Sequence, residues 1–394
     1  MISFVWSSKY PFLAGTGGSE NYTAGQVREL MRRGIETRII TLGHGTSDGR
    51  DDFPDIPFLA LDKKEHLSEL DDTIVFITYP LNVSTKHKSY VILHCPPLSC
   101  ARRDPLFEPK AFVGKKLITP SRYAAKLWSK QARQTGRDIA TVYPFAEDCF
   151  SRVQRPARKG KKTRILFAGR LTPDKGVYTL LASLHMDKMQ DLDYELTMTS
   201  ACSHPKEGQV VRAILEAHPW VNLVPARRSP QEMAELMAEH DIVVMPSTDI
   251  FWHEAFGILS VEAQHAGCRV VASKAGGIPE TNTGSSILVK ADDPQALANG
   301  LAKAAALGPL TTFERAKAST KFTVANSVDT LLQTIEETSR LAMLPQKMLP
   351  HMKAVRRKLS QQKLQLVESV DHLKQDTYAV LGQARKRQPH PKNL

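Results

Sequence analysis

Two glutamates, Glu254 and Glu262, stand eight residues apart on either side of Phe256 and Gly257. Carboxylates accept hydrogen bonds well from the vicinal hydroxyls of a sugar. The apolar spacing that begins at Ile258 is helical, so Gly257 immediately precedes a helix whose first backbone N–H groups are unpaired. A diphosphate group fits such a helix end. We therefore predict a nucleotide-sugar site in which Glu254 faces the sugar and Glu262 faces a ribose.

A second segment, with residues suited to phosphate binding, lies upstream from Arg164 to Gly176. Its pattern is a strand, a glycine turn and a helix start. Gly169 allows the backbone to turn tightly and to approach a ligand. Arg170 can bind phosphate oxygens through two hydrogen bonds, and Lys175 supplies a compact positive charge near the same place. A solvated turn is the alternative for either cation alone.

The amino terminus has a similar strand, glycine loop and helix. The strand is predicted at residues 2–6, and the loop contains Gly17 and Gly18. A dinucleotide-binding loop is a competing interpretation. Glu20 argues against it, because that position would need glycine or alanine for close helix packing.

A histidine, His94, ends the apolar run that begins at Tyr90. Open α/β sheets place their ligand contacts at the carboxyl ends of the strands, where His94 would lie. A purely structural role is the alternative for a lone histidine at such a position.

Taken together, these motifs resemble the family-four retaining glycosyltransferases of the GT-B fold. The resemblance rests on Glu254-x7-Glu262 with its Phe-Gly, on the segments that contain Gly169, His94 and Gly17, and on the run from Ala275 to Glu280. It implies two doubly wound, Rossmann-like α/β domains that face a cleft. The chain departs from the family at Pro144 to Asp148, where Asn-Gly-Val-Asp is frequent, and this puts an acceptor or hinge role of that segment in doubt.

The resemblance also implies roles for individual residues. Arg170 and Lys175 would hold the donor diphosphate, and His94 and Glu254 would lie at the transferred sugar. Glu262 would hold the ribose. The remaining predicted donor-binding positions are Gly17, Gly18, Glu20, Gly169, Phe256, Gly257, Ile258 and Leu259.

The order of the strands predicts the domain organisation. Strands are expected at 2–6, 36–41, 73–78, 90–94, 115–119 and 139–143, and again at 164–168, 194–199, 221–224, 241–245, 269–273 and 286–289. We predict an acceptor-side domain over 1–150, a linker over 151–163, a nucleotide-sugar domain over 164–320, a closing helix over 321–344 and a basic amphipathic helical tail over 345–394. The length suits two domains, each with its own core.

The predicted tail carries much of the charge. Residues 345–394 contain eleven Lys and Arg against three Asp and Glu, which is eight of the twelve net positive charges. An apolar residue recurs every seven positions from Met352 to Val380, as in an amphipathic helix. Docking on the chain's own surface, a homodimer contact and a peripheral contact with anionic lipid remain open. Nucleic acid is not predicted as a partner, because aromatic residues do not interleave the basic ones.

Other residues bear on whether a metal or cofactor is needed and on the cellular compartment of the protein. The five cysteines show no metal-binding spacing and suit reduced thiols in a cytoplasm. No run is long enough to span a membrane, and the start is too short for a signal peptide. Asp191 and Asp193 form an Asp-x-Asp pattern, but they precede a strand on the side away from the expected crevice. We predict no cofactor and no metal, because Arg170 and Lys175 can neutralise the leaving diphosphate.

The predicted function is retaining transfer of a sugar from a nucleoside diphosphate sugar, with UDP preferred, to a hydroxyl of a small-molecule or lipid-linked acceptor. No side chain is an obvious nucleophile, and the resemblance implies that the leaving phosphate takes the acceptor proton. A sugar-nucleotide epimerase or a phosphorylase of the same fold would use similar donor residues. A non-catalytic sugar-nucleotide-binding protein is the other alternative.

Overall fold

The computed structural model describes residues 1–15, 18–97, 108–131, 139–157, 160–200, 205–216, 218–250 and 253–342. Met1–Thr334 form one compact unit, and a second unit begins at Ile335. Gly17 and the predicted tail over 345–394 lie outside the described residues, so the predictions for them stay predictions. Within the described ranges, no helix combines the length and apolarity needed to cross a bilayer.

The first part of the unit contains a parallel sheet that has, among the described residues, seven strands in the order β3-β2-β1-β4-β5-β6-β7. The strands are β1 (Ile2–Trp6), β2 (Thr37–Leu42), β3 (Phe58–Leu61), β4 (Thr73–Ile77), β5 (Tyr90–Ile92), β6 (Lys116–Thr119) and β7 (Ile139–Thr141). Each predicted strand of this part is confirmed within a few residues. The edge strand β3 was not predicted, because it is short and only partly buried.

The second part contains a parallel sheet with six strands in the described residues, in the order β10-β9-β8-β11-β12-β13. They are β8 (Thr163–Phe167), β9 (Tyr194–Thr199), β10 (Val221–Val224), β11 (Ile242–Met245), β12 (Arg269–Ser273) and β13 (Ile287–Val289). All four residues of β11 are buried, which agrees with their continuous apolar sequence. Two doubly wound α/β domains are therefore present, as predicted.

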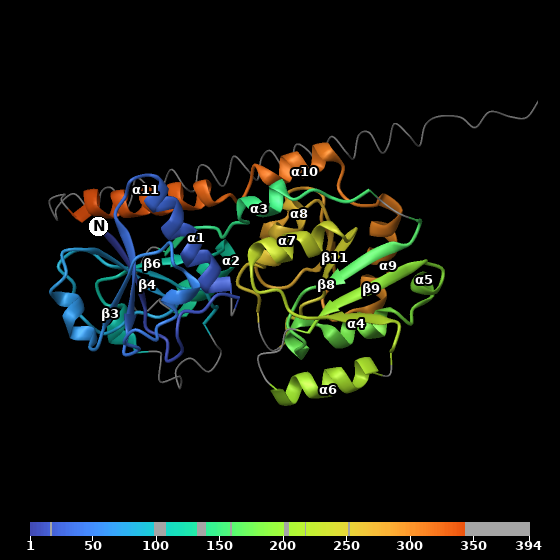
Figure 1. The fold of residues 1–394 in the computed structure, drawn as a ribbon, viewed down its shortest axis with the longest axis horizontal. Helices are drawn as coiled ribbons and strands as arrows, with labels where there is room; N and C mark the ends of the chain where they lie inside the picture. Colours follow the sequence, from blue (N-terminus) through green and yellow to red (C-terminus); the bar gives the residue numbers. More distant parts are fainter. Residues whose placement is uncertain are drawn as a thin grey trace, which may run out of the picture. The chain divides into compact units, whose positions relative to one another are not determined.

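Helices cover both faces of the second sheet. In Figure 1, α7 and α8 lie on one side of β8, β9 and β11, and α4 lies on the other. The core on the α4 side includes Val177, Leu180 and Val244, and the core on the other side includes Val243 and Val261. Because neighbouring residues of β11 point to opposite faces, Val243 and Val244 enter different cores.

The helices complete the element order. The described α-helices are α1 (Gly18–Arg32), α2 (Arg122–Gln131), α3 (Asp148–Arg152), α4 (Val177–Ser183), α5 (Asp187–Gln190), α6 (Pro205–Glu216), α7 (Pro230–Ala238), α8 (Ile258–His265), α9 (Pro294–Leu307), α10 (Thr312–Ser319) and α11 (Val324–Ala342). The described 3-10 helices are η1 (Arg50–Asp52), η2 (Lys64–Ser68), η4 (Pro109–Phe112), η6 (Pro173–Lys175) and η7 (Ile278–Thr281).

The start of α11 contacts α1 of the first domain. Gln26 Nε2 donates to Ser327 Oγ at 3.2 Å, and both side chains are buried. Arg33 pairs with Asp329 and also donates to the carbonyl of Ala325 at 3.1 Å. The chain therefore crosses from the second domain back to the first through this helix.

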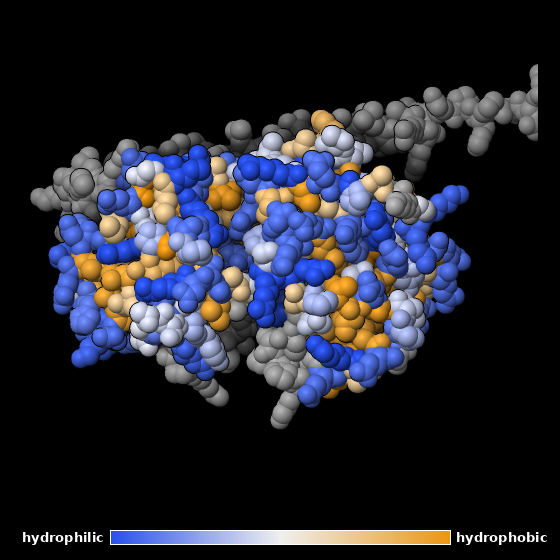
Figure 2. Space-filling model, viewed as in Figure 1, coloured by the Kyte–Doolittle hydropathy of each residue, from blue (hydrophilic) through white to orange (hydrophobic). Residues whose placement is uncertain are grey.

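The surface of the unit is mixed in character. On the face shown in Figure 2, apolar residues lie in separate groups, and hydrophilic residues lie between them. Phe313 and Ile250 are the most exposed of the large apolar side chains in the described residues, and they belong to different segments. Single exposed apolar residues of this kind are ordinary for a soluble surface.

Candidate nucleotide-sugar site

The topology of the second sheet places three predicted site residues together. The strand order reverses between β8 and β11, and a doubly wound sheet binds ligands outside the carboxyl ends of the strands at such a point. Arg170 and Lys175 follow β8, and Glu254 follows β11. All three residues are therefore at the expected binding edge of the sheet.

Lys175 and Glu254 form an ion pair across this edge. The Nζ atom of Lys175 contacts Oε1 of Glu254, and both side chains are mostly buried. Ser247 Oγ also lies 3.4 Å from the same carboxylate oxygen. Asp174 lies beside Arg170 and Lys175, at 3.5 Å and 3.9 Å respectively. The site therefore holds two cations and two carboxylates in a small space.

Close backbone contacts fix the two loops that carry this pair. Gly176, which follows Lys175, has a φ of 73°, and a Cβ atom there would lie 1.8 Å from the carbonyl oxygen of Pro246. A residue with a side chain cannot occupy this position without moving the loop. The N–H of Thr248 donates to the carbonyl of Asp174 at 3.0 Å. The loops after β8 and β11 are therefore held together as one assembly.

Helix α8 begins beside this assembly. Gly257 is its N-cap residue, with φ 99° and ψ 60°, and the helix starts at Ile258 as predicted. The first N–H groups of a helix lack intrahelical partners and attract anions. The Phe256 ring is buried against Tyr143 and Phe322, with ring centroids 5.6 Å and 5.4 Å away. The structure thus gives the Phe256 side chain a packing role in this loop.

His94 has an unsatisfied ring nitrogen. Its Nε2 atom is buried without a hydrogen-bond partner among the described residues, and its ring lies 5.1 Å from that of Tyr22. Burial lowers the pKa of His94 to about 4, so the ring is neutral at physiological pH. A buried polar atom without a partner is costly, and a ligand hydroxyl would satisfy it.

Cys95, the residue after His94, lies within reach of the charges of three site residues. The charges of Glu254, Arg170 and Lys175 all act on the Cys95 thiol, whose pKa is raised to about 11 chiefly by burial. Glu20 acts on the same thiol. The end of β5 in the first domain therefore faces the cation-rich edge of the second.

The glycine loop of the first domain also meets the second domain. A Cβ atom at Gly18 would lie 3.3 Å from Cδ1 of Ile258, so the starts of α1 and α8 are adjacent. Glu20 is buried on α1 and accepts a hydrogen bond from Ser19 Oγ at 2.6 Å. The contact with Ile258 places Gly18 beside the junction between the domains.

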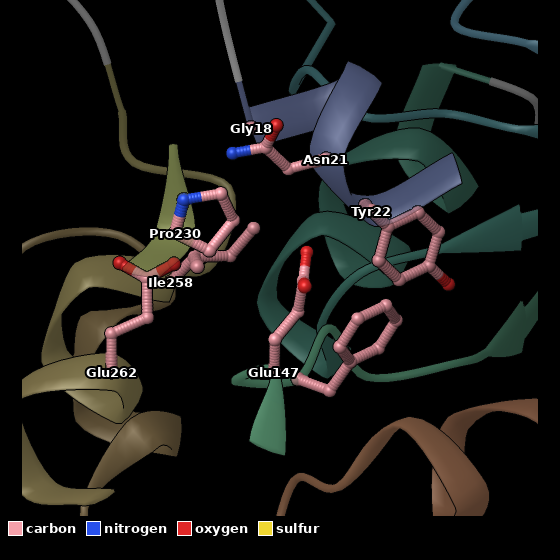
Figure 3. A pocket seen from close by; sticks show the side chains of 8 residues that line it. Gly18, Asn21, Tyr22, Glu147, Pro230, Ile258 and Glu262 are labelled. Atoms are coloured by element: carbon pink, nitrogen blue, oxygen red, sulfur yellow. The ribbon is translucent and has the colours of Figure 1, made fainter. Parts of the chain in front are cut away.

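Glu262 points into a small cavity at this junction. The cavity has a volume of about 30 Å³ and is lined by Gly18, Asn21, Tyr22, Phe145, Glu147, Pro230, Ile258 and Glu262. Figure 3 shows the side chains of Glu147 and Glu262 on separate walls, with both carboxylates directed into the cavity. Glu254 and Lys175 are not among the lining residues. The two glutamates of the sequence motif therefore face different places.

Burial perturbs the ionisation of both carboxyls in the cavity. Burial and, to a smaller degree, the charge of Glu147 raise the pKa of Glu262 to about 8. Burial also raises the pKa of Glu147, and Arg28 opposes that change. Glu262 is therefore largely protonated at neutral pH.

This raised pKa predicts how stability depends on pH. Between its ordinary pKa of 4.5 and the folded value of about 8, Glu262 holds more protons in the folded state than in the unfolded state. The free energy of unfolding should therefore fall as pH rises through this window. Glu262→Gln should remove this part of the fall and be more stable than the wild type at pH 8.5 by on the order of 2 kcal/mol. Urea unfolding at pH 5, 7 and 8.5 measures the difference.

An exposed glutamate of the same domain serves as the control for this prediction. Glu216 lies at the exposed end of α6, so Glu216→Gln should follow the wild-type pH profile. Parallel profiles for Glu262→Gln and the wild type would contradict the assignment of Glu262 as a carboxyl protonated by burial.

Sequence reasoning missed three residues at the domain junction. Glu147 and Asn21 line the cavity, and the only signal for Glu147 was the departure from the family pattern in its segment. The carboxylate of Glu280 accepts from the backbone N–H groups of Arg122 and Tyr123 at 3.0 Å and 2.7 Å. Glu280 thus caps α2 of the first domain from η7 of the second, which no local pattern could indicate.

The predicted Asp-x-Asp pattern does not belong to the site. Asp191 and Asp193 are exposed and precede β9, at the amino end of the strand, and Asp193 lies 3.9 Å from Lys162. In the described part of the chain, no group of three or more His, Cys, Asp or Glu is arranged to hold a metal ion.

A protein-family model matches most of the second domain. Residues 162–306 match the family model for glycosyl transferases group 1. These residues form a group 1 glycosyltransferase domain. The domain contains Arg170, Lys175, Glu254 and Glu262, whereas His94 and Glu147 precede the matched residues in the chain.

Two curated relatives match this chain over 176 and 183 residues. A D-inositol 3-phosphate glycosyltransferase of Corynebacterium kroppenstedtii is 32% identical over 176 residues, which cover 42% of this chain and 38% of the relative. A lipopolysaccharide 1,2-N-acetylglucosaminetransferase of Salmonella typhimurium is 31% identical over 183 residues, which cover 43% of each chain. The chain therefore matches less than half the length of these relatives.

Solved structures match over both domains. A glycosyltransferase from Rickettsia africae has a TM-score of 0.66 at 19% identity, covering 85% of this chain and 97% of that one. HepE of Anabaena, in complex with UDP and glucose, has a TM-score of 0.60 at 18% identity, covering 85% of this chain and 99% of that one. The group 1 glycosyltransferase domain thus belongs to a chain with the two-domain GT-B fold.

Proposed function

We propose that the chain is a retaining, metal-independent glycosyltransferase that moves a sugar from a nucleoside diphosphate sugar to a hydroxyl group of a small-molecule or lipid-linked acceptor. One observation carries the proposal: Lys175, Glu254 and Arg170 meet at the carboxyl ends of β8 and β11, inside a group 1 glycosyltransferase domain. This is the edge at which a doubly wound sheet binds its ligand.

The proposed diphosphate site combines two kinds of positive charge. The start of α8 offers backbone N–H groups at Gly257, Ile258 and Leu259. Arg170 and Lys175 add side-chain cations, and the carboxylates of Glu254 and Asp174 hold these cations in place.

The proposed reaction is the same-face transfer that the family resemblance implies. The bond between the anomeric carbon and the phosphate oxygen breaks, and a new bond forms between that carbon and the acceptor oxygen on the same face. The acceptor proton passes to the leaving phosphate. Negative charge develops on the diphosphate, and Lys175, Arg170 and the α8 N–H groups stabilise it without having to reorganise.

His94 and Glu254 are assigned to the sugar. The neutral ring of His94 has an unpaired Nε2 atom, which a sugar hydroxyl would satisfy. Glu254 accepts from sugar hydroxyls while its carboxylate stays next to Lys175. The ribose is assigned to Glu262, which lies in the separate cavity. UDP is the proposed nucleotide, and its presence in the HepE complex supports this choice by analogy of fold.

A thermal-shift panel tests the donor. UDP-, GDP-, ADP- and dTDP-sugars should give distinct stabilisation, and the true donor at a hundred times its dissociation constant should stabilise the fold by about 2.7 kcal/mol. The free nucleotides serve as controls for the sugar contribution. A panel in which no nucleotide or nucleotide-sugar stabilises the protein would overturn the proposal.

Metal independence makes a separate prediction. Turnover should survive EDTA, because Arg170, Lys175 and the start of α8 provide the positive charge that a metal ion would otherwise supply. Rates measured with and without EDTA, and after addition of manganese, check this. Loss of activity in EDTA that manganese restores would show that a metal takes part.

Assays distinguish this function from its alternatives. An epimerase of this fold would convert the donor without an acceptor, and a phosphorylase would require inorganic phosphate. A non-catalytic protein would bind the donor and turn over none of it. Product analysis with acceptor alone, phosphate alone and neither separates these cases.

A further inference from the structure

We propose that Glu147 is a second ribose-binding residue, so that two carboxylates hold the nucleoside of the donor. The inference rests on the proposed function and extends it. It assigns Glu147, from the loop before α3, to the same task as Glu262 on α8. Binding of the nucleoside would then depend on a segment that precedes the residues matched by the family model.

The geometry of the cavity is the first observation. Glu147, immediately before α3, and Glu262, on α8, line the same cavity and direct their carboxylates into it (Figure 3). Neither carboxylate has a hydrogen-bond or ion-pair partner among the described residues. Both side chains are half-buried, and a ligand with two hydrogen-bond donors would satisfy the two carboxylates together.

The chemistry of the walls defines that ligand. Once both groups are ionised they only accept hydrogen bonds, so they suit a ligand with two donors close together. The vicinal hydroxyls of a ribose meet this need, with one hydroxyl for each carboxylate. Tyr22, Phe145 and Pro230 form apolar walls that suit the faces of a sugar ring, and the amide of Asn21 can both donate and accept.

The position of the cavity relative to α8 is a second, independent observation. Ile258 lines the cavity and is also the first residue of α8, whose free N–H groups are proposed to bind the diphosphate. In a nucleoside diphosphate, the ribose is bonded directly to the phosphate through its 5′ oxygen. A diphosphate at the start of α8 therefore brings the ribose to this cavity.

Repulsion between the two carboxyls fits the same role. Glu147 contributes to the raised pKa of Glu262, so Glu262 carries a proton at neutral pH. Two ribose hydroxyls would replace those protons as donors and allow both carboxylates to ionise. Glu147 also belongs to the Pro144 to Asp148 segment, in which the sequence departs from the family pattern.

Calorimetry with deoxynucleotides tests the proposal. The ligands are UDP, GDP and ADP, each with its 2′-deoxy and 3′-deoxy forms, titrated into the wild type, Glu147→Gln and Glu147→Ala. In the wild type, each missing hydroxyl should weaken binding about tenfold. Both variants should bind the parent nucleotide about tenfold more weakly and should no longer distinguish it from one of the two deoxy forms.

Asp148→Asn is the matched control. Asp148 is the next residue, is exposed and pairs with Arg152, and it does not line the cavity. It should leave nucleotide affinity and both deoxy penalties unchanged. Circular dichroism and a melting curve establish that each variant is folded, and the isosteric glutamine preserves the volume of the side chain.

Three outcomes would overturn the proposal. Variants at Glu147 that bind all nucleotides as the wild type does would show that Glu147 does not contact the ribose, while the proposed function stands. Mg²⁺ or Mn²⁺ that binds the wild type without nucleotide, and fails to bind Glu147→Gln, would make the carboxylates a cation site. A wild type that binds no nucleoside diphosphate would overturn the proposed function as well.

Discussion

Lys175→Ala should lower the turnover number by about a hundredfold or more while the protein stays folded. The variant loses the cation that contacts Glu254 and that is proposed to stabilise the leaving diphosphate. Charge on the diphosphate grows in the transition state, so the rate should fall more than donor affinity. Steady-state kinetics with saturating donor, combined with calorimetric titration of the donor, measures both quantities.

A second lysine controls for the loss of charge. Lys188 on α5 is exposed and lies in the same domain, so Lys188→Ala should leave the rate unchanged. Lys175→Ala also leaves the mostly buried Glu254 without its cation, which should cost on the order of 1–3 kcal/mol of stability. A variant that is destabilised by this amount and still turns over normally would remove Lys175 from the chemistry.

Glu254→Gln should lower the turnover number on the order of a hundredfold, with a smaller effect on donor affinity. Glu254 is assigned to the reacting sugar, and its contacts should tighten as the sugar approaches an oxocarbenium-like state. Because the amide lacks charge, the variant also loses the ion pair with Lys175. Saturated rates and donor titration with the intact nucleotide-sugar separate the two effects.

Glu262→Gln should show the opposite profile, with a larger effect on donor affinity than on the saturated rate. Glu262 lies in the cavity and away from the Lys175 pair, so its loss should weaken donor binding by about 1.5–3 kcal/mol and change the saturated rate less. If the two glutamine variants share one profile, or if their profiles are exchanged, the division of roles between the glutamates is wrong. The family assignment would be unaffected.

The local features of the fold could be predicted from the sequence. The apolar run before Met245, the breaker Pro246 and the glycine at 257 predicted a buried strand, a loop and a helix start, and the structure has each of them. These features depend on residues that are near one another in the chain, where periodicity and backbone preference act. β3 was not predicted, because its position at the sheet edge, more than its own sequence, makes it a strand.

The sequence by itself determined that a glycine-capped helix, two cations and two glutamates follow parallel strands, because short-range patterns fix those elements. Only the tertiary structure decided which groups meet. Lys175 and Glu254 are paired across 79 residues because β8 and β11 are neighbours at the reversal of strand order. Glu147 faces the cavity of Glu262 because α3, which follows Glu147, packs against α7 and α8. Ser121 Oγ of the first domain also donates to the carbonyl of Ala255 in the second at 2.5 Å. Contacts of this kind depend on packing between distant segments, and no local pattern records them.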